Sequence, residues 1–140
     1  MSRTTTNKPL ATRNLKLYIP LILLIFAMGL STRTITRLPR WTILYAGDFL
    51  WAMLVFFLFC LIFRLQTGKA FVVALITTYL IEITQLFHPP WLEALREIRL
   101  FALVFGFSFL WADILVYTLG ICLGALIDWV LLSRVQWGHE

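Results

Sequence analysis

The sequence predicts an all-α integral membrane protein, with four transmembrane helices and one amphipathic interfacial helix between the third and the fourth. Two features of the composition favour this class. Hydrophobic residues make up 61% of the 140 residues, against about 45–50% in an ordinary soluble domain. Charged residues make up only 14%, roughly half the usual share. A soluble fold of this length could not bury so much apolar surface, whereas a bilayer removes that requirement.

The third feature is a set of four apolar runs, which cover roughly residues 15–31, 48–63, 70–87 and 110–132. Each run is near the length that crosses a hydrocarbon core of about 30 Å at about 1.5 Å per residue. Backbone groups in lipid must be satisfied within the segment, so these runs are expected to be helices rather than strands. The pair Gly47-Asp48 is expected to open the second helix.

The segment between the third and fourth runs has the pattern of a helix lying in the membrane interface, predicted over residues 91–104. Its apolar face comprises Trp91, Ala94, Leu95, Ile98, Phe101 and Ala102. Its polar face comprises Glu93, Arg96 and Glu97. This division is typical of a helix in the interface plane. The alternative is a solvated polar face that has no further role.

Four crossings place both termini on one side of the membrane domain, residues 15–132. The tails, residues 1–14 and 133–140, carry, together with the adjacent Lys16 and the loop from Arg64 to Lys69, seven of the 12 Lys and Arg residues, and the two opposite loops carry five. The positive-inside rule therefore favours cytoplasmic tails, in the cytoplasmic membrane of a bacterium. Attraction to anionic lipids explains the net charge of +5. No basic stripe with interleaved aromatics supports nucleic-acid binding.

Alternation of helix direction brings three acidic residues to one end of the bundle. Asp48 begins the predicted second helix, Glu82 lies near the end of the third, and Asp113 lies in the first turn of the fourth. Under the preferred orientation this end faces outward. An ionisable group as deep as Glu82 is costly, so it should face a protein partner or a wet cavity.

Both Glu82 and Asp48 also have a structural interpretation. Glu82 shares a polar helix face with Gln85, and it would then be a staple between helices, protonated or paired with Arg96 or Arg99. Asp48 would cap its helix, where a carboxylate suits the free backbone N–H groups and the helix dipole. The sequence leaves these alternatives open.

The fourth helix carries a regular buried face. Its members are Asp113, Tyr117, Gly120, Gly124 and Asp128. At 100° per residue they fall within about 80° of one another. The G-x-x-x-G step lets a neighbouring backbone approach closely. We expect it to pack within the chain, against the third helix, rather than to form a dimer.

No metal site or cofactor is predicted. The two histidines, His88 and His139, lie in different parts of the chain, so a zinc site is poorly supported. Cys60 and Cys122 lie in the middle of apolar runs without ligand spacing, which is typical of packing residues rather than of a disulfide. Ser108 has no evident base beside it.

Residues 80–87 and 107–124 resemble the VanZ-like membrane proteins. Their pattern is an acid-x-x-Gln at the end of one helix, followed in the next helix by an arginine, two aspartates, an asparagine and a G-x-x-x-G. The matching positions are Glu82, Gln85, Asp113, Gly120 and Gly124. Phe107 stands at the arginine position, Leu110 at the first aspartate and Tyr117 at the asparagine.

The Gly47-Asp48 pair and the inserted segment from Trp91 to Arg99 make the chain more similar still to an uncharacterised bacterial membrane family, domain of unknown function 2809. This resemblance covers roughly residues 15–130. VanZ-like proteins are associated with low-level resistance to the glycopeptide teicoplanin. Three motif residues differ here, so resistance is not carried over. The shared residues imply an outward-facing polar pocket between the third and fourth helices.

The leading hypothesis is a binding or accessory protein of the cell envelope rather than an enzyme. Membrane lipids, or a lipid-linked envelope ligand, would occupy the polar pocket. Its predicted lining residues are Asp48, Glu82, Gln85, Arg96, Arg99, Asp113 and Tyr117. One alternative is a membrane enzyme that uses Glu82 or Asp113 as a general base on a lipid head group. Another is a structural or assembly subunit without a ligand, and a homo-oligomer stays open.

Overall fold

The computed structural model describes residues 13–35, 37, 39–101 and 111–137. The helices in this part of the chain are α1 (Leu15–Thr34), α2 (Arg40–Ile62), α3 (Thr67–Thr84), α4 (Pro90–Glu97) and α6 (Trp111–Trp137). The four long helices contain apolar spans of 20, 23, 18 and 24 residues, each long enough to cross a membrane. The chain is therefore an all-helical multi-pass membrane protein, as predicted.

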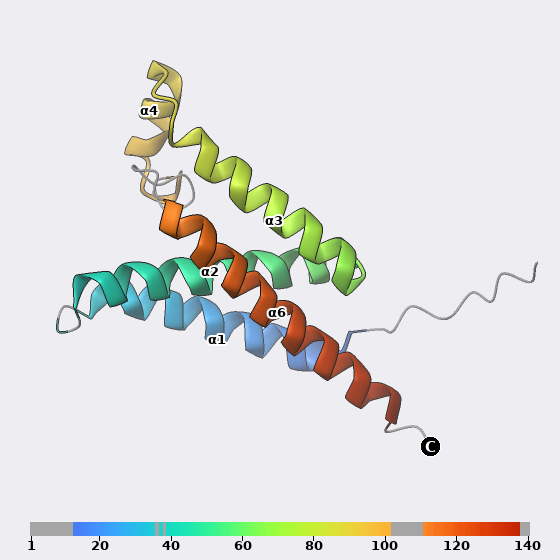
Figure 1. Ribbon diagram of the computed structural model, residues 1–140. Helices are drawn as coiled ribbons and strands as arrows, with labels where there is room; N and C mark the ends of the chain where they lie inside the picture. The colour runs from blue at the N-terminus through green and yellow to red at the C-terminus, as the bar shows by residue number, and fades with distance from the viewer. Residues whose placement is uncertain (1–12, 36, 38, 102–110, 138–140) are drawn as a thin grey trace, which may run out of the picture.

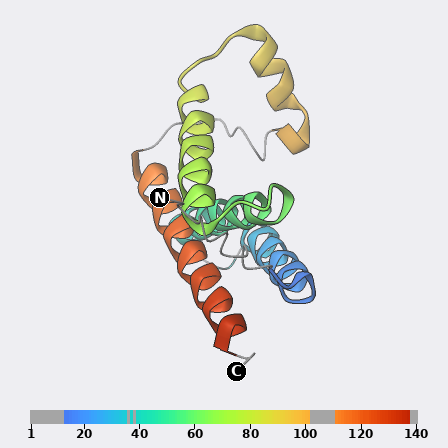
Figure 2. The same cartoon turned by 90° about the vertical axis from the view of Figure 1, so that its right-hand side faces the viewer.

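The second helix is the centre of the bundle. It packs against α1, α3 and α6, and α3 also packs against α6. Figure 1 shows α1 and α2 side by side, α6 running diagonally across them and α3 rising diagonally from the end of α2, and Figure 2 gives the same bundle from the side. Large apolar side chains elsewhere point outward, such as Leu23 with 60% and Leu119 with 54% of their surface exposed. These side chains form a surface suited to lipid.

The alternating helices give the bundle two ends. At one end α1 begins, α2 ends, α3 begins and α6 ends, and we call it the Asp128 end (Figure 1). At the other end α1 ends, α2 begins, α3 ends and α6 begins, and we call it the Glu82 end.

The second helix begins eight residues earlier than predicted, at Arg40. Gly47 lies inside it, where an added Cβ would come within 3.1 Å of the Thr32 hydroxyl of α1. Gly47 therefore permits close approach of two helices and does not mark a helix start. The capping interpretation of Asp48 is wrong for the same reason, because this residue lies in the helix interior.

The third helix ends at Thr84 rather than at Phe87. The N–H groups of residues 85–87 bond to carbonyls three residues back, which forms a tighter turn before Pro89 and Pro90. Glu82 consequently lies two positions from the helix end instead of the five that we predicted.

The predicted interfacial helix is shorter than expected. α4 covers Pro90–Glu97, the extended backbone of Ile98 interrupts it, and residues 99–101 are helical again. Positions 102–104, Phe107, Ser108 and Leu110 lie outside the described residues.

The burial of the side chains of α4 agrees only in part with the apolar and polar faces that the sequence predicts. Trp91 and Ile98 are 65% and 49% exposed, so the apolar face points away from the protein. Arg96, by contrast, is only 1% exposed. Its expected place on a solvated face beside Glu93 and Glu97 is wrong, because its guanidinium binds the end of α3 as described below.

Candidate functional site

Several predicted site residues meet at the Glu82 end, and we call them the acidic cluster. Its members are Asp48 of α2, Glu82 and Gln85 of α3 and its C-cap, and Asp113 and Tyr117 of α6. The Gln85 amide Nε2 donates to Glu82 Oε2 over 3.1 Å. Glu82 also lies within hydrogen-bonding range of Asp113 and of the Tyr117 hydroxyl. Asp48 is close enough to Asp113 to interact with it electrostatically.

The members of the acidic cluster differ in their exposure to solvent. Glu82 is fully buried, and Gln85 and Asp113 are each 5% exposed. Asp48 is half-buried. A ligand that reaches the cluster would therefore meet Asp48 first.

The contact between Glu82 and Asp113 has a chemical consequence. Two carboxyl groups form a hydrogen bond only when one of them carries a proton, because two ionised carboxylates repel each other. A direct hydrogen bond between Glu82 and Asp113 would therefore require a proton on one of the two carboxyl groups.

The acidic cluster is short of hydrogen-bond donors. Gln85 Oε1 and Asp113 Oδ1 are buried, and neither accepts a hydrogen bond from any described residue. A buried polar atom left in this way costs about 1–3 kcal/mol. An external group that donates hydrogen bonds would remove that cost. No three His, Cys, Asp or Glu side chains in the described ranges are placed to hold a metal ion.

The α6 face that carries Asp113 is buried along its whole length. Its members are Asp113, Tyr117, Gly120, Gly124 and Asp128. A Cβ at Gly120 would overlap the backbone carbonyl of Phe49, and one at Gly124 would come within 3.0 Å of the Phe56 ring. Both of these neighbours belong to α2. The predicted packing of this face on the third helix is therefore wrong, and its contact with α2 is what brings Asp113 near Asp48.

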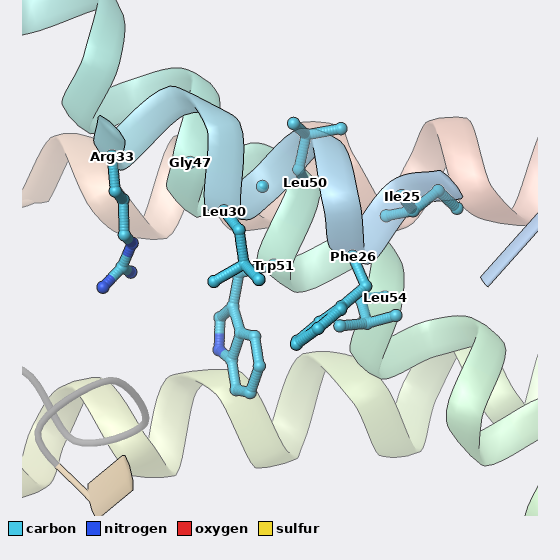
Figure 3. A pocket seen from close by; sticks show the side chains of 9 residues that line it. Ile25, Phe26, Leu30, Arg33, Gly47, Leu50, Trp51 and Leu54 are labelled. Carbon is cyan, nitrogen blue, oxygen red and sulfur yellow. The ribbon is translucent and has the colours of Figure 1, made fainter. Parts of the chain in front are cut away.

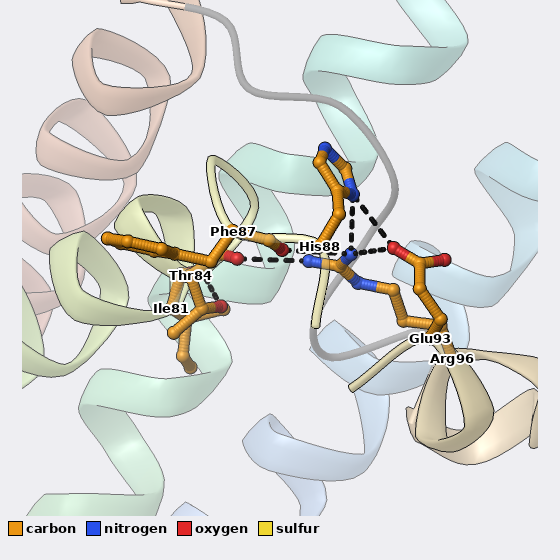
Figure 4. Close-up of polar contacts among 6 residues, drawn as sticks. All are labelled: Ile81, Thr84, Phe87, His88, Glu93 and Arg96. Atoms are coloured by element: carbon orange, nitrogen blue, oxygen red, sulfur yellow. Dashed lines mark hydrogen bonds and ion pairs between the residues drawn. The ribbon is translucent and has the colours of Figure 1, made fainter. Parts of the chain in front are cut away.

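Arg96 lies apart from the acidic cluster, at the corner between α3 and α4 (Figure 4). Its guanidinium donates to the carbonyls of Thr84 over 3.0 Å and of Phe87 over 3.4 Å, and to Glu93 Oε1 over 2.7 Å. A cation at this position satisfies the last carbonyls of α3 and suits its dipole. Arg99 is exposed and forms no hydrogen bond or ion pair in the part of the chain that the structure describes. The structure does not place either arginine in the acidic cluster.

Glu93 completes this corner. It accepts from His88 Nδ1 over 2.8 Å as well as from Arg96. The hydrogen bond with His88 and, after it, the one with Arg96 lower the pKa of the Glu93 carboxyl. The corner therefore holds α4 against the end of α3 through a carboxylate that stays ionised at neutral pH.

A second polar group, which sequence analysis missed, lies at the Asp128 end. We call it the Asp128 cluster: Arg13, Tyr18, Thr67 and Asp128. Arg13 Nε and Nη2 each donate to Asp128 over 2.8 Å, in a bidentate pair. The Tyr18 and Thr67 hydroxyls donate to the same carboxylate over 2.5 and 2.6 Å. Asp128 is fully buried, and both of its oxygens are satisfied.

Arg13 also joins the Asp128 cluster to the loop between α2 and α3. Its Nη1 donates to the Leu65 carbonyl over 2.6 Å and to the Cys60 carbonyl over 3.2 Å. The hydrogen bond to Asp128 raises the pKa of the guanidinium above its ordinary value, so Arg13 is always charged. The signal for this cluster was Asp128 itself, an acid inside an apolar run that needs a partner.

A comparison with known protein families identifies the family to which the chain belongs. The model of the family described as protein of unknown function (DUF2809) matches residues 37–121, which is more than half of the sequence. The chain belongs to the DUF2809 family. The matched region of this DUF2809 protein contains every member of the acidic cluster, whereas Arg13, Tyr18 and Asp128 lie outside it. No solved structure matches the chain.

Proposed function

We propose that this DUF2809 protein binds the head group of a lipid or lipid-linked envelope ligand at the acidic cluster. The observation that carries the proposal is the pair of buried acceptors, Gln85 Oε1 and Asp113 Oδ1, which receive no donor from the described residues. A ligand with N–H or O–H groups would supply both hydrogen bonds. The buried site gives such bonds more strength than they have in water.

The position of the acidic cluster favours an amphiphile over a soluble ligand. Glu82 and Asp113 lie near the ends of membrane spans, at the depth where lipid head groups meet hydrocarbon. The surrounding outward surface is apolar, with Leu80 57% and Leu115 63% exposed. A ligand that approaches through the bilayer would keep its chains against this surface while its head group reaches the acids.

We place this site on the outer side of a bacterial cytoplasmic membrane, with both tails in the cytoplasm, because of the bias in basic residues. Reporter fusions after residue 140 and in the loop between α1 and α2 test the orientation. A cytoplasmic signal from that loop, with an external signal from residue 140, would reverse it and place the acidic cluster inside.

Mass spectrometry of lipids that copurify with the protein tests the binding function. The variant Glu82→Gln is nearly isosteric and removes a carboxyl from the centre of the cluster. We expect it to accumulate normally and to lose the copurifying lipid that the wild type retains. Glu97→Gln is the matched control, because it makes the same change at an exposed position of α4.

Two results would count against the binding function. One is an identical lipid profile for Glu82→Gln and the wild type, which would make the cluster a structural staple. The other is loss of the lipid from Glu97→Gln as well, which would show that the effect does not come from the acidic cluster.

A second function is favoured by the contact between Glu82 and Asp113. A carboxyl pair that holds a proton could transfer it to a lipid head group as a general acid or base. A deletion strain would then contain a chemically altered lipid pool, restored by the wild type and not by Asp113→Asn. We also propose that the family is related to the VanZ-like proteins through the matching acid-x-x-Gln and G-x-x-x-G positions, without extending antibiotic resistance to this chain.

A further inference from the structure

A groove lies between α1 and α2 (Figure 3). It holds about 60 Å³ of open space, and most of its lining is apolar: Ile25, Phe26, Leu30, Leu50, Trp51 and Leu54. From Ile25 to Arg33 it follows α1 for eight residues, or about 12 Å. That length is close to the depth of one leaflet of a hydrocarbon core of about 30 Å.

The groove ends at a pair of opposite charges. Arg33 lies at its mouth, as Figure 3 shows, and is exposed. It forms no hydrogen bond or ion pair with any described side chain. Asp48 is near enough to interact with it electrostatically. Gly47, which also lines the groove, directly precedes Asp48.

We infer that an acyl chain of the ligand lies along this open groove and that the ligand is a phospholipid with a zwitterionic, primary-amine head group. This inference rests on the proposed function. The phosphate would bind the Arg33 guanidinium, which suits a phosphate because it offers parallel N–H donors. The ammonium group would point to Asp48 and onward into the acidic cluster. Beyond the apolar groove come first the Arg33 cation and then the Asp48 anion. A phospholipid of this kind has its groups in the matching order: the acyl chain, then the phosphate anion and then the ammonium cation.

The acceptors of the acidic cluster distinguish this head group from other common ones. A primary ammonium has three N–H donors, enough for Asp48, Gln85 Oε1 and Asp113 Oδ1 together. A quaternary ammonium carries the same charge and has no N–H donor, so it would leave the two buried acceptors unsatisfied. A glycerol head group has hydroxyl donors, but its lipid is anionic and offers no cation to the carboxylates.

Binding of defined lipids to the purified full-length protein in detergent tests the inference. Phosphatidylethanolamine, phosphatidylcholine and phosphatidylglycerol with identical acyl chains are titrated and counted by native mass spectrometry. We expect phosphatidylethanolamine to bind about tenfold more tightly than either of the others, the factor that corresponds to one charge-assisted hydrogen bond. Equal binding of phosphatidylethanolamine and phosphatidylcholine would overturn the head-group assignment.

Three variants test the groove. Gly29→Leu places a side chain in it, and the added Cβ fits because its nearest neighbour, Leu50 Cβ, is 3.9 Å away. Arg33→Gln removes the charge at an exposed position and leaves folding intact. Each should weaken phosphatidylethanolamine binding about tenfold. Gly68→Leu is the matched control, since an added Cβ there has no neighbour within 4 Å and Gly68 lies outside the groove.

The outcomes separate this inference from the function on which it rests. If Gly29→Leu and Arg33→Gln bind phosphatidylethanolamine as the wild type does while Glu82→Gln loses it, the groove is not the acyl-chain site and the acidic cluster still binds a head group. If Glu82→Gln also binds it normally, the proposed function fails together with the inference. If Gly29→Leu does not fold, Arg33→Gln alone decides.

Discussion

At the Asp128 end one buried carboxylate receives four hydrogen bonds, from Arg13, Tyr18 and Thr67. At the Glu82 end three acidic residues come together, and Arg33 interacts electrostatically with one of them, Asp48, at the edge of the cluster. Each cluster includes a residue from one face of α6: Asp113 in the acidic cluster and Asp128 in the other. One cluster is therefore fully hydrogen-bonded within the chain, whereas in the other Gln85 Oε1 and Asp113 Oδ1 receive no hydrogen bond from the described residues.

This difference suggests that the Asp128 cluster stabilises the fold, whereas the acidic cluster serves to recognise a ligand. A buried charge with all its hydrogen bonds made fixes the geometry of the helices around it, and removal of one partner is costly. A buried group that lacks donors stabilises nothing until another molecule supplies them. Substitutions at the two ends should consequently have opposite effects on unfolding and on lipid binding.

The largest effect should come from Asp128→Ala. It leaves Arg13, whose side chain is only 9% exposed, without its counter-ion. Removal of one partner from a buried pair typically costs about 3–5 kcal/mol. Thermal unfolding in detergent should show this loss, and the variant should accumulate in the membrane at a lower level than the wild type. A stability equal to that of Asp113→Ala would remove the distinction between the two ends.

A smaller loss of stability should follow from adding a side chain at Gly120 or Gly124, which lie on α6 between the acidic cluster and the Asp128 cluster. A Cβ at Gly120 meets a backbone carbonyl of α2, which cannot move without its helix, whereas one at Gly124 meets side-chain atoms of Phe56 and Met53. Overpacking typically costs about 1–3 kcal/mol. We expect Gly120→Ala to lie at the upper end of this range and Gly124→Ala at the lower end, in the same unfolding assay. The reverse order would mean that α2 and α6 are not in contact through Gly120.

The Glu82→Gln substitution should change unfolding least among the buried sites. The side chain keeps its size and loses a carboxyl from a group of acids, so we expect a change below about 1 kcal/mol. Its lipid binding should nevertheless be lost. Unfolding by several kcal/mol would instead assign Glu82 the structural role that belongs to Asp128.

The smallest effect concerns the corner between α3 and α4. The folded protein lowers the pKa of Glu93, so its contribution to stability is present above the ordinary pKa of about 4.3 and is lost as the pH falls through the lowered value. The difference in unfolding temperature between the wild type and Glu93→Gln should be present at pH 7 and diminish as the pH falls below about 4.3. A difference that grows on acidification would contradict the hydrogen bonds drawn in Figure 4.

The sequence predicted those features that depend on local pattern. Apolar runs identified the four spans. The intervals of four, three, four and four residues between Asp113, Tyr117, Gly120, Gly124 and Asp128 identified the buried face of α6. Alternation of helix direction was enough to place Asp48, Glu82 and Asp113 at one end. These predictions need only the geometry of a helix and the thickness of a membrane.

Neighbours in space were harder to predict. Gly47 was interpreted as a helix start because glycine often marks one, but here it lets α2 approach Thr32 of α1. The glycine step of α6 showed that a close contact exists and not which helix makes it, and the partner is α2. Arg13 resembled the other basic residues of the tail, because nothing in its local sequence distinguishes a buried guanidinium from one that meets lipid head groups.

The bond between Arg13 and Asp128 joins residues 115 positions apart, and this separation fixes when it can form during biosynthesis. Arg13, Tyr18 and Thr67 all leave the ribosome before α6 does. A lone aspartate adds about 2.5–3.5 kcal/mol to the cost of insertion at the centre of a transmembrane helix, and less toward its ends. α6 thus enters the membrane beside donors that are already in place and that offset this cost for Asp128. Membrane integration of α6 depends in this way on the segment around α1, and Asp128 anchors that segment only after α6 has been synthesised.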